Sequence, residues 1–477
     1  MTGLKVLANV CITALFFFAL ALSSGAQTFT TVFDFDNTNG AEPNFLVQGD
    51  DGNLHGTTTA GGVRKAGTVF QLTPDGKLTT LYSFCSRKNC TDGYEPLSLV
   101  QTSDGSWFGL TSTGGFKSSS CAFGCGTLFQ LTPSGALRVL HSFCSQTNCT
   151  DGASPTPQLI QAADGKFYGT TKFGGAYNQG TIYSLTSSGN FTVLYNFCYP
   201  TNCSGGQLPW VGLIQANNGV LYGTTAFGGT MGGGGTIYRI TTNGNFSSLY
   251  GFTNGEEAAP DALIQGADGN LYGTSLSVGT GGTVFKFSAG GTYTTLHTFC
   301  LQSGCPDGYG PYGGLTQGSD GGLYGITPNG GSGSGGTIFE ITRTGTFVLP
   351  HSFCAGGGSC PDGYVPLALI QGTNGLFYGV TQSGGIGYGT VYSLSMGLGP
   401  FVKATSTFGR VGMTIGVLGN NLIGTTSVTF NGTSASFTVV SDTYITASVP
   451  TGATTGTIEV ITSSGTLSSN VPFRVLP

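Results

Sequence analysis

Charged side chains are scarce in this sequence. Only 8% of its 477 residues are Asp, Glu, Lys or Arg, against about 25% in an average soluble protein. The 16 basic and 21 acidic residues give a formal net charge of −5, and the basic residues form no cluster. A nucleic-acid-binding surface needs such a cluster to neutralise phosphates. We therefore expect no nucleic-acid partner.

Long apolar runs are missing after the first residues. Residues 1–26 combine an early lysine, an apolar stretch and small residues before Gln27, a pattern typical of a secretory signal peptide. The alternative is a retained anchor, but the stretch is shorter than the ~20 residues that span a bilayer. We expect a secreted or cell-surface protein with no transmembrane segment once the signal is removed.

Glycine and aromatic residues are abundant, and they recur in a unit of about fifty residues. A Leu-Tyr-Gly-Thr-Thr-like anchor and a Gly-Thr-(Val/Ile/Leu)-(Phe/Tyr) anchor each occur seven times. The first has its glycine at Gly56, Gly109, Gly169, Gly223, Gly273, Gly325 and Gly379. The second begins at Gly67, Gly126, Gly180, Gly235, Gly282, Gly336 and Gly389. Such periods indicate a solenoid, a propeller or an array.

Each unit contains four strand-like runs. In the second unit they are residues 96–101, 107–112, 126–132 and 137–143, and Asp-Gly or Ser-Gly turns separate the hairpin pairs. These turns are hairpin signals. Four-stranded antiparallel units repeated seven times predict an all-β fold, a seven-bladed β-propeller over residues 27–396.

The ends of the array predict a closed ring. The seventh unit has no fourth strand after residues 389–394, whereas residues 29–35 match the fourth-strand pattern of residues 78–84. We expect the first strand of the mature chain to complete the last blade, which protects the sheet edges.

Strand alternation also decides which loops share a side. The connections from second to third strand, and from fourth strand to the next unit, emerge together on what we call the disulfide face. The two tight turns of each unit emerge on the opposite side, the tight-turn face. Loops on a rigid scaffold are where function is usually found.

The cysteines form local pairs. Cys11 lies in the signal peptide, and an even number of remaining cysteines in a secreted chain predicts disulfides. Zinc is the alternative, but the pairs are isolated and the chain has only four histidines. The unit around residues 252–257 has no pair and is the expected soft point. The predicted disulfides are Cys85–Cys90, Cys121–Cys125, Cys144–Cys149, Cys198–Cys203, Cys300–Cys305 and Cys354–Cys360.

A different pattern follows a short linker at residues 397–400. Strand-like runs at 413–422, 427–432, 437–440, 445–450 and 456–461 predict a small immunoglobulin-like β-sandwich over residues 401–477.

Two families share these motifs. The repeat resembles the GloVer repeat of secreted bacterial proteins, often called choice-of-anchor tandem-repeat proteins, which implies a surface location and no established activity. The carboxyl-terminal segment resembles an IPT/TIG domain through Val428-Thr-Phe-Asn-Gly432 and Gly456-Thr-Ile-Glu-Val460. That resemblance implies a spacer or a binding module.

The histidines and one set of aspartates have structural interpretations. His55, His141, His297 and His351 occupy repeat positions that hold aromatic residues elsewhere, which favours packing over general-base chemistry. Asp51, Asp104, Asp164, Asp268 and Asp320 recur at one turn where Asn218 and Asn374 substitute, as turn geometry allows.

The candidate binding residues lie in Cys-x-Asp-Gly segments. They are Asp92, Asp151, Asp307 and Asp362, three of which precede Tyr94, Tyr309 and Tyr364. One interpretation is an Asx-type turn with a packed tyrosine. The other is a ring of oxygen ligands and aromatic platforms around the channel, suited to calcium or to sugar rings.

Two classes of function follow. The first is a non-catalytic, monomeric binding protein that engages a glycan or a surface protein through the disulfide face, without a cofactor unless calcium binds. The second is a propeller-type glycoside hydrolase or polysaccharide lyase, which needs paired carboxylates. The sequence favours the first, because most acids sit in turn positions and no unit shows an outlying acid–histidine pair.

Overall fold

The computed structural model describes residues 27–119, 121–199, 202–253, 259–276 and 281–476. This part of the chain is built from strands, and its helical elements are two single turns, η1 (Lys88–Cys90) and η2 (Thr147–Cys149). Within these ranges no helix has the length and hydropathy to cross a membrane. The expected signal peptide lies outside the described residues. Most of the segment at residues 252–257, which was expected to lack a cysteine pair, also lies outside them.

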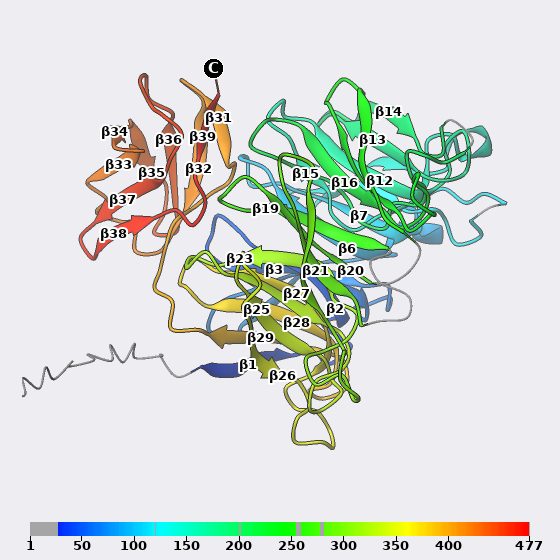
Figure 1. Ribbon diagram of the computed structural model, residues 1–477, viewed down its shortest axis with the longest axis horizontal. Coiled ribbons are helices and arrows are strands. Elements are labelled where there is room, and N and C mark those ends of the chain that lie inside the picture. Colours follow the sequence, from blue (N-terminus) through cyan, green and yellow to red (C-terminus); the bar gives the residue numbers. More distant parts are fainter. Residues whose placement is uncertain (1–26, 120, 200–201, 254–258, 277–280, 477) are drawn as a thin grey trace, which may run out of the picture.

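Seven antiparallel sheets follow one another along residues 28–395 (Figure 1). Sheets 1 to 3 are β2 (Ala41–Gln48), β3 (Leu54–Ala60), β4 (Thr68–Leu72) and β5 (Leu78–Ser83); β6 (Tyr94–Gln101), β7 (Trp107–Thr113), β8 (Thr127–Leu131) and β9 (Leu137–Ser142); and β10 (Ala153–Pro155), β11 (Ile160–Gln161), β12 (Phe167–Phe173), β13 (Thr181–Leu185) and β14 (Phe191–Asn196). In sheet 3 the first strand is split, because β10 and β11 both pair with β12.

The remaining repeat sheets keep the same strand order. Sheets 4 and 5 are β15 (Ile214–Gln215), β16 (Leu221–Thr225), β17 (Thr236–Ile240) and β18 (Phe246–Gly251); and β19 (Pro260–Gln265), β20 (Leu271–Ser275), β21 (Thr283–Phe287) and β22 (Tyr293–Thr298). Sheets 6 and 7 are β23 (Tyr312–Gln317), β24 (Leu323–Thr327), β25 (Thr337–Ile341) and β26 (Phe347–Ser352); and β27 (Tyr364–Gln371), β28 (Phe377–Ser383), β29 (Thr390–Ser395) and β1 (Thr28–Asp34).

The first strand of the chain completes the last repeat sheet, as the sequence predicts. β1 pairs antiparallel with β29, with Thr28 opposite Ser395 and Asp34 opposite Thr390. In Figure 1 the two strands lie side by side although they are more than 350 residues apart in sequence. The pairing covers both edges that the seventh unit and the chain start would otherwise leave open.

One hydrogen bond recurs at the junctions between sheets. The residue before the proline of each first strand donates its N–H to a carbonyl of the preceding sheet, over 2.7–3.0 Å. Sheets 1 and 7 are joined in the same way as the others, by Glu42 and Tyr388. The seven bonds are Glu42–Tyr388, Glu95–Ala66, Ser154–Cys125, Leu208–Gln179, Ala259–Gly234, Gly310–Gly281 and Val365–Gly335.

Glutamines add a second set of junction bonds that the sequence analysis missed. The last residue of a first strand accepts an N–H bond from the first tight turn of the preceding sheet, over 2.7–3.0 Å. Sheets 7 and 1 again follow the rule, because Thr373 donates to Gln48. The acceptors are Gln48, Gln101, Gln215, Gln265, Gln317 and Gln371.

The two sequence anchors lie opposite each other on neighbouring strands. The anchor glycine on the second strand faces the aromatic ring on the third, as Gly56 faces Phe70, and a Cβ at that glycine would meet the ring. Two positions further along the strands, a buried hydroxyl–hydroxyl bond of 2.8–2.9 Å, for example Thr58–Thr68, occurs in all seven sheets. Close packing and hydrogen-bond satisfaction therefore explain why both motifs recur.

The carboxyl-terminal strands form a second core. One sheet contains β30 (Lys403–Ala404), β32 (Thr414–Leu418), β36 (Tyr444–Ser448) and β35 (Phe437–Val439); the other contains β34 (Thr433–Ser434), β33 (Ser427–Phe430), β37 (Ile458–Thr462) and β38 (Gly465–Ser468). A parallel pair joins β31 (Phe408–Arg410) to β39 (Arg474–Leu476). Their shared core includes Val417, Val428, Ile445 and Val460.

This second core rests on the tight-turn face (Figure 1). Thr443 Oγ1 donates to the carbonyl of Asp50 over 2.8 Å, and Asn420 Nδ2 donates to Thr373 Oγ1 over 2.8 Å. Asn470 Nδ2 donates to the Gln317 carbonyl, while Gln317 Nε2 donates back to the Asn470 carbonyl. These contacts reach the first tight turns of sheets 1, 6 and 7, so the carboxyl-terminal strands cover part of this side of the ring.

Candidate functional site

The six disulfides form between the cysteines that the sequence pairs. Five of them close the loop between a fourth strand and the next sheet, and Cys121–Cys125 closes the loop between β7 and β8. The ten cysteines in the five loops all have positive φ, between 47° and 67°. L-residues rarely adopt this conformation, and surrounding structure must hold it in place.

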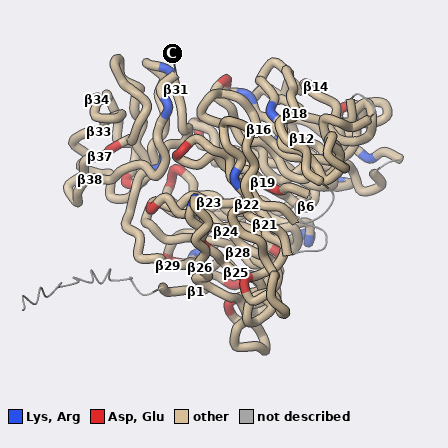
Figure 2. The backbone as a smooth tube through the Cα atoms, in the orientation of Figure 1, with Lys and Arg blue, Asp and Glu red and all other residues tan. Residues whose placement is uncertain are grey.

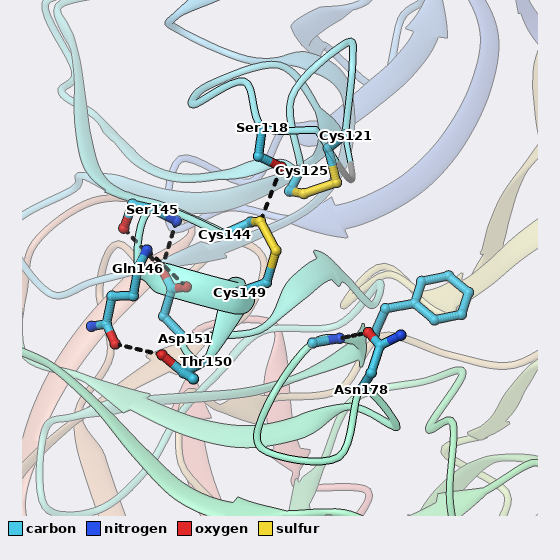
Figure 3. The surroundings of a disulfide bond; sticks show 12 residues. Ser118, Cys121, Cys125, Cys144, Ser145, Gln146, Cys149, Thr150, Asp151 and Asn178 are labelled. Carbon is cyan, nitrogen blue, oxygen red and sulfur yellow. Dashed lines mark hydrogen bonds between the residues drawn. A yellow bond between two sulfur atoms is a disulfide. The ribbon is translucent and has the colours of Figure 1, made fainter.

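An aspartate organises four of these five loops from inside, the exception being the Cys198–Cys203 loop, and Figure 3 shows this arrangement around Asp151. Its carboxylate accepts hydrogen bonds from Ser145 N at 3.0 Å, Ser145 Oγ at 2.8 Å and Gln146 N at 3.3 Å. The side chain of Asp151 is fully buried beside the Cys144–Cys149 disulfide. The carboxylate therefore satisfies backbone donors of its own loop.

The same carboxylates contact a ring on the preceding fourth strand. His141 Nε2 lies 3.2 Å from Asp151 Oδ2, and Tyr82 Oη donates to Asp92 Oδ2 over 2.8 Å. His297 pairs with Asp307 at 2.9 Å and His351 with Asp362 at 3.1 Å. The sequence indicates no outlying acid–histidine pair in any unit, but the structure pairs acids with histidines at the repeat positions themselves. The pairs escaped notice because each joins a strand to a loop ten or eleven residues further along the chain.

These rings also stack on the next sheet. His141 lies 3.8 Å from Phe191, His297 4.0 Å from Phe347 and His351 3.9 Å from Phe29, with ring planes within 9° of parallel. Burial lowers the pKa of His351 and outweighs the opposing effect of Asp362. The histidines thus fill aromatic positions between sheets, as the sequence analysis predicts.

The turn aspartates also act as the sequence suggests. Asp164 Oδ1 accepts from Lys166 N two residues on, and its Oδ2 accepts from Tyr168 Oη over 2.7 Å. Asp51 makes the corresponding contact with His55 at 3.1 Å. Turn geometry and a partner on the second strand account for these acids.

In the three Asp-Gly-Tyr segments Asp92 is fully buried, whereas Asp307 and Asp362 are partly exposed. Tyr309 and Tyr364 are each 41% exposed, and Tyr94 is half-buried with its hydroxyl donating to the Lys65 carbonyl. Asp307 accepts from Cys300 N, and Asp362 accepts from Cys354 N. Each aspartate is thus brought together with the ring and backbone of its own loop, and not with the other aspartates.

The acids do not assemble a cation site. Among the described residues, the one group of three or more potential ligands within 4.8 Å is Cys121, Cys125 and Cys144, whose sulfurs belong to two disulfides. Calcium requires six to eight converging oxygen ligands. The four loop aspartates lie in separate loops and direct their oxygens at backbone N–H groups, so they do not provide this arrangement.

Large apolar side chains are exposed mainly on the disulfide face. Sequence analysis missed most of them, because they lie in the variable loops and outside the repeat anchors. Side chains at least 39% exposed in these loops or at their ends are Val63, Phe116, Phe123, Phe173, Tyr199, Phe227, Met231, Leu301, Tyr309, Tyr364, Ile386 and Tyr388. Outside the carboxyl-terminal strands, the other large apolar side chains exposed in the described residues are Val348 and Leu349 on β26. Exposed apolar side chains are a feature of interaction surfaces where they form a contiguous patch.

The repeat itself identifies the family. Residues 16–205 and 198–392 match the Gloeobacter/Verrucomicrobia repeat. The chain belongs to this repeat family. In this chain the paired anchors and the junction bonds recur in all seven sheets. No curated protein matches the chain.

Solved structures share the fold at low sequence identity. The extracellular domain of a protein assigned as a hybrid two-component system from B. thetaiotaomicron is 12% identical, with a TM-score of 0.50 over 90% of this chain and 52% of that one. The extracellular domain of an assigned one-component system from the same bacterium is 11% identical, with a TM-score of 0.51 over 92% and 57%. This chain spans little more than half of those structures, and the likeness shows a β-propeller-like fold alone.

Proposed function

We propose that the chain is an extracellular, non-catalytic binding protein: a seven-bladed β-propeller followed by an immunoglobulin-like domain of the IPT/TIG type. The seven junction bonds support the propeller, and the two packed sheets after residue 401 support the second domain. Six disulfides support an oxidising, extracellular environment. The domain boundaries are those expected above, with a signal peptide at 1–26 and a linker at 397–400.

The observation that carries the proposal is the one-sided exposure of apolar side chains. They gather on the disulfide face, whereas the carboxyl-terminal domain contacts the tight-turn face. The disulfide face is therefore the side of the propeller that is free to receive a glycan or a surface protein. Tyr94, Tyr309 and Tyr364 are the repeated aromatic contacts on it, and the loop aspartates orient their loops through hydrogen bonds to the backbone.

A propeller hydrolase or lyase receives less support. Such enzymes need an accessible carboxylate pair or a base that reaches the substrate. The four loop aspartates instead accept N–H bonds inside their own loops, and three of them pair with histidines that stack between sheets. No specific observation favours catalysis at these residues.

The proposal is tested with the three tyrosines. Wild type and the Tyr94→Ala, Tyr309→Ala, Tyr364→Ala triple variant are compared on a glycan array and against bacterial surface extracts. We expect the triple variant to lose binding while its melting temperature falls by only a few degrees, because Tyr309 and Tyr364 are exposed and Tyr94 is half-buried. Val348→Ala, on β26 away from the disulfide face, is the control. Undiminished binding by the triple variant would contradict the site.

A further inference from the structure

A hollow of about 360 Å³ lies between the fourth strands of sheets 3 and 4, at the rim of the disulfide face. Its walls come from β14, β18, the disulfide loop that ends at Cys203 and the loop between β16 and β17. The side chains and backbone that define it include Tyr195, Tyr199, Ser204, Gly205, Thr230 and Phe246. This volume falls at the lower end of small-molecule sites, which run from about 300 to 1,000 Å³.

In this loop a glycine stands where the other four disulfide loops carry an aspartate. The N–H of Cys198 bonds to the carbonyl of Gly206, as that of Cys144 bonds to Gly152. Gly205 therefore occupies the position of Asp151. A Cβ at Gly205 would lie 2.8 Å from Tyr195 Oη and 3.1 Å from the ring of Phe246, so an aspartate would extend into the space that the hollow occupies.

The missing acid also changes the partner of the ring. Tyr82 Oη donates to the loop carboxylate of Asp92, whereas Tyr195 Oη donates to the backbone carbonyl of Tyr199 over 3.2 Å. Tyr199 is 61% exposed at this site. At this position the chain therefore has no loop carboxylate, and the space beside Gly205 is open and bordered by the exposed ring of Tyr199.

The lining is aromatic and hydroxylated, and it contains no charged residue. Thr230, Ser204, Ser247 and Ser248 supply hydroxyl groups that both donate and accept. Of the four lining rings, Tyr195 stacks on Phe246 and Tyr250 stacks on Tyr293, whereas Tyr199 is the most exposed. Aromatic faces carry partial negative charge and attract the C–H face of a sugar ring. In the drawn part of the chain, charged residues of both signs are few and intermixed (Figure 2). Another hollow, on sheet 1, is lined by Arg64 and by Tyr82 as its one aromatic ring, and lacks this combination.

We propose that the hollow between β14 and β18 binds a neutral saccharide unit, with Tyr199 as the stacking platform and the serine and threonine hydroxyls as hydrogen-bonding partners. The inference rests on the proposed function, because it takes the disulfide face as a binding surface, and it names both a site and a ligand class on that face. Absence of charge in the lining selects neutral sugars over uronic or sialic acids, since a buried carboxylate would find no cationic partner.

The test restores the residue that the other loops carry. Full-length mature protein is titrated with neutral oligosaccharides of glucose, mannose, galactose or N-acetylglucosamine, and with an oligouronate, by calorimetry and saturation-transfer NMR. In Gly205→Asp the Tyr195 side chain must shift to admit the new Cβ, and the new carboxylate should then accept from Tyr195, as Asp92 does from Tyr82, and occupy part of the hollow. The melting temperature of the variant is measured to show that it still folds. Tyr199→Ala removes the platform and leaves the backbone acceptor in place. We expect each variant to weaken binding of the neutral sugar at least about tenfold.

Three results would overturn the inference: equal binding by Gly205→Asp and wild type, binding of the oligouronate only, or no neutral saccharide bound at about 10 mM. The triple tyrosine variant separates this site from the proposed function. A ligand lost by the triple variant but kept by Gly205→Asp would leave the binding face intact and refute the hollow. A ligand kept by the triple variant but lost by Gly205→Asp would support the hollow as the binding site and refute the role of the three tyrosines.

Discussion

At the scale of single residues, the loop aspartate stabilises its disulfide loop by accepting hydrogen bonds from the loop's backbone and side chains. Burial by itself raises the pKa of Asp151, but hydrogen bonds from His141, Ser145 and Gln146 outweigh burial and lower the pKa below its ordinary value. A lowered native pKa means that ionised Asp151 stabilises the fold above about pH 4, and that this contribution is lost as the pH falls through the native pKa.

Asp151→Asn tests this contribution because asparagine resembles the protonated acid. We expect the variant to be destabilised by about 1.5–3 kcal/mol at pH 7, the range for hydrogen bonds to charged groups. The difference in melting temperature between wild type and variant should shrink as the pH falls below 4. Asp75→Asn, at an exposed turn, serves as the control. A difference that is independent of pH would mean that the charge of Asp151 contributes nothing.

The anchor glycine is a second residue whose role is packing. In sheet 4, Gly223 lies opposite the fully buried Tyr238, and a Cβ there would collide with the tyrosine hydroxyl and ring and lie 3.0 Å from Leu213. Gly223→Ala should cost about 1–3 kcal/mol through overpacking, measured by chemical unfolding. Gly290→Ala is the matched control, because its Cβ would have no neighbour closer than 3.7 Å. Equal stability of the two variants would contradict the packing explanation.

At the scale of elements, β1 holds the ring closed. It covers the open edge of β29, and its Phe29 stacks on His351 of sheet 6 and on Tyr392 of its own sheet. Deleting residues 28–34 should therefore lower the melting temperature of all seven sheets together, since the junction between sheets 7 and 1 would lose an edge strand and a stacked ring. Circular dichroism melting and limited proteolysis check this outcome. Unchanged melting with a protease-sensitive amino terminus would refute closure by β1.

Strand prediction succeeded where local pattern and tertiary environment agree. The second unit was expected at residues 96–101, 107–112, 126–132 and 137–143, and the structure has Tyr94–Gln101, Trp107–Thr113, Thr127–Leu131 and Leu137–Ser142. The split of the first strand in sheet 3 was not foreseen. After residue 401 the five expected strands are present, but β30, β31, β34, β38 and β39 were missed, because short strands take their pairing from distant partners.

At the scale of the whole molecule, the carboxyl-terminal domain docks through polar contacts. Thr443, Asn420 and Asn470 reach three different repeat sheets, and Arg474 Nη1 donates to Asn217 Oδ1 of a fourth over 3.3 Å. Interfaces of this kind are weaker than a shared core. Docking should nevertheless couple the unfolding of the two parts.

Replacing Thr443, Asn420 and Asn470 by alanine together should uncouple the two parts. We expect differential scanning calorimetry to show wild type melting with overlapping transitions, and the triple variant with a lower transition for the carboxyl-terminal domain, shifted by several degrees. Thr414→Ala, whose side chain contacts Ser448 within the domain, is the control. Identical thermograms for wild type and the triple variant would show that these bonds do not couple the parts.

The sequence by itself determined the repeat, the strand order within each unit, the closing strand and the cysteine pairs. Each of these features follows from the spacing of nearby residues or from a comparison of one repeat unit with another. Both can be read directly from a periodic sequence. The turn role of Asp51 and Asp164, and the packing role of His141, could likewise be inferred from the residues that replace them in other units.

Only the tertiary structure decided what each loop residue contacts. Asp151 and His141 are ten residues apart in sequence. Gln48 and Thr373, which bond at the junction between sheets 1 and 7, lie near opposite ends of the repeat array in sequence. No local sequence pattern therefore predicts either contact. The hollow at Gly205 depends on an absent side chain between two sheets. Periodicity fixes the unit, whereas burial, exposure and contact between units arise only when the chain closes into a ring and brings distant positions together.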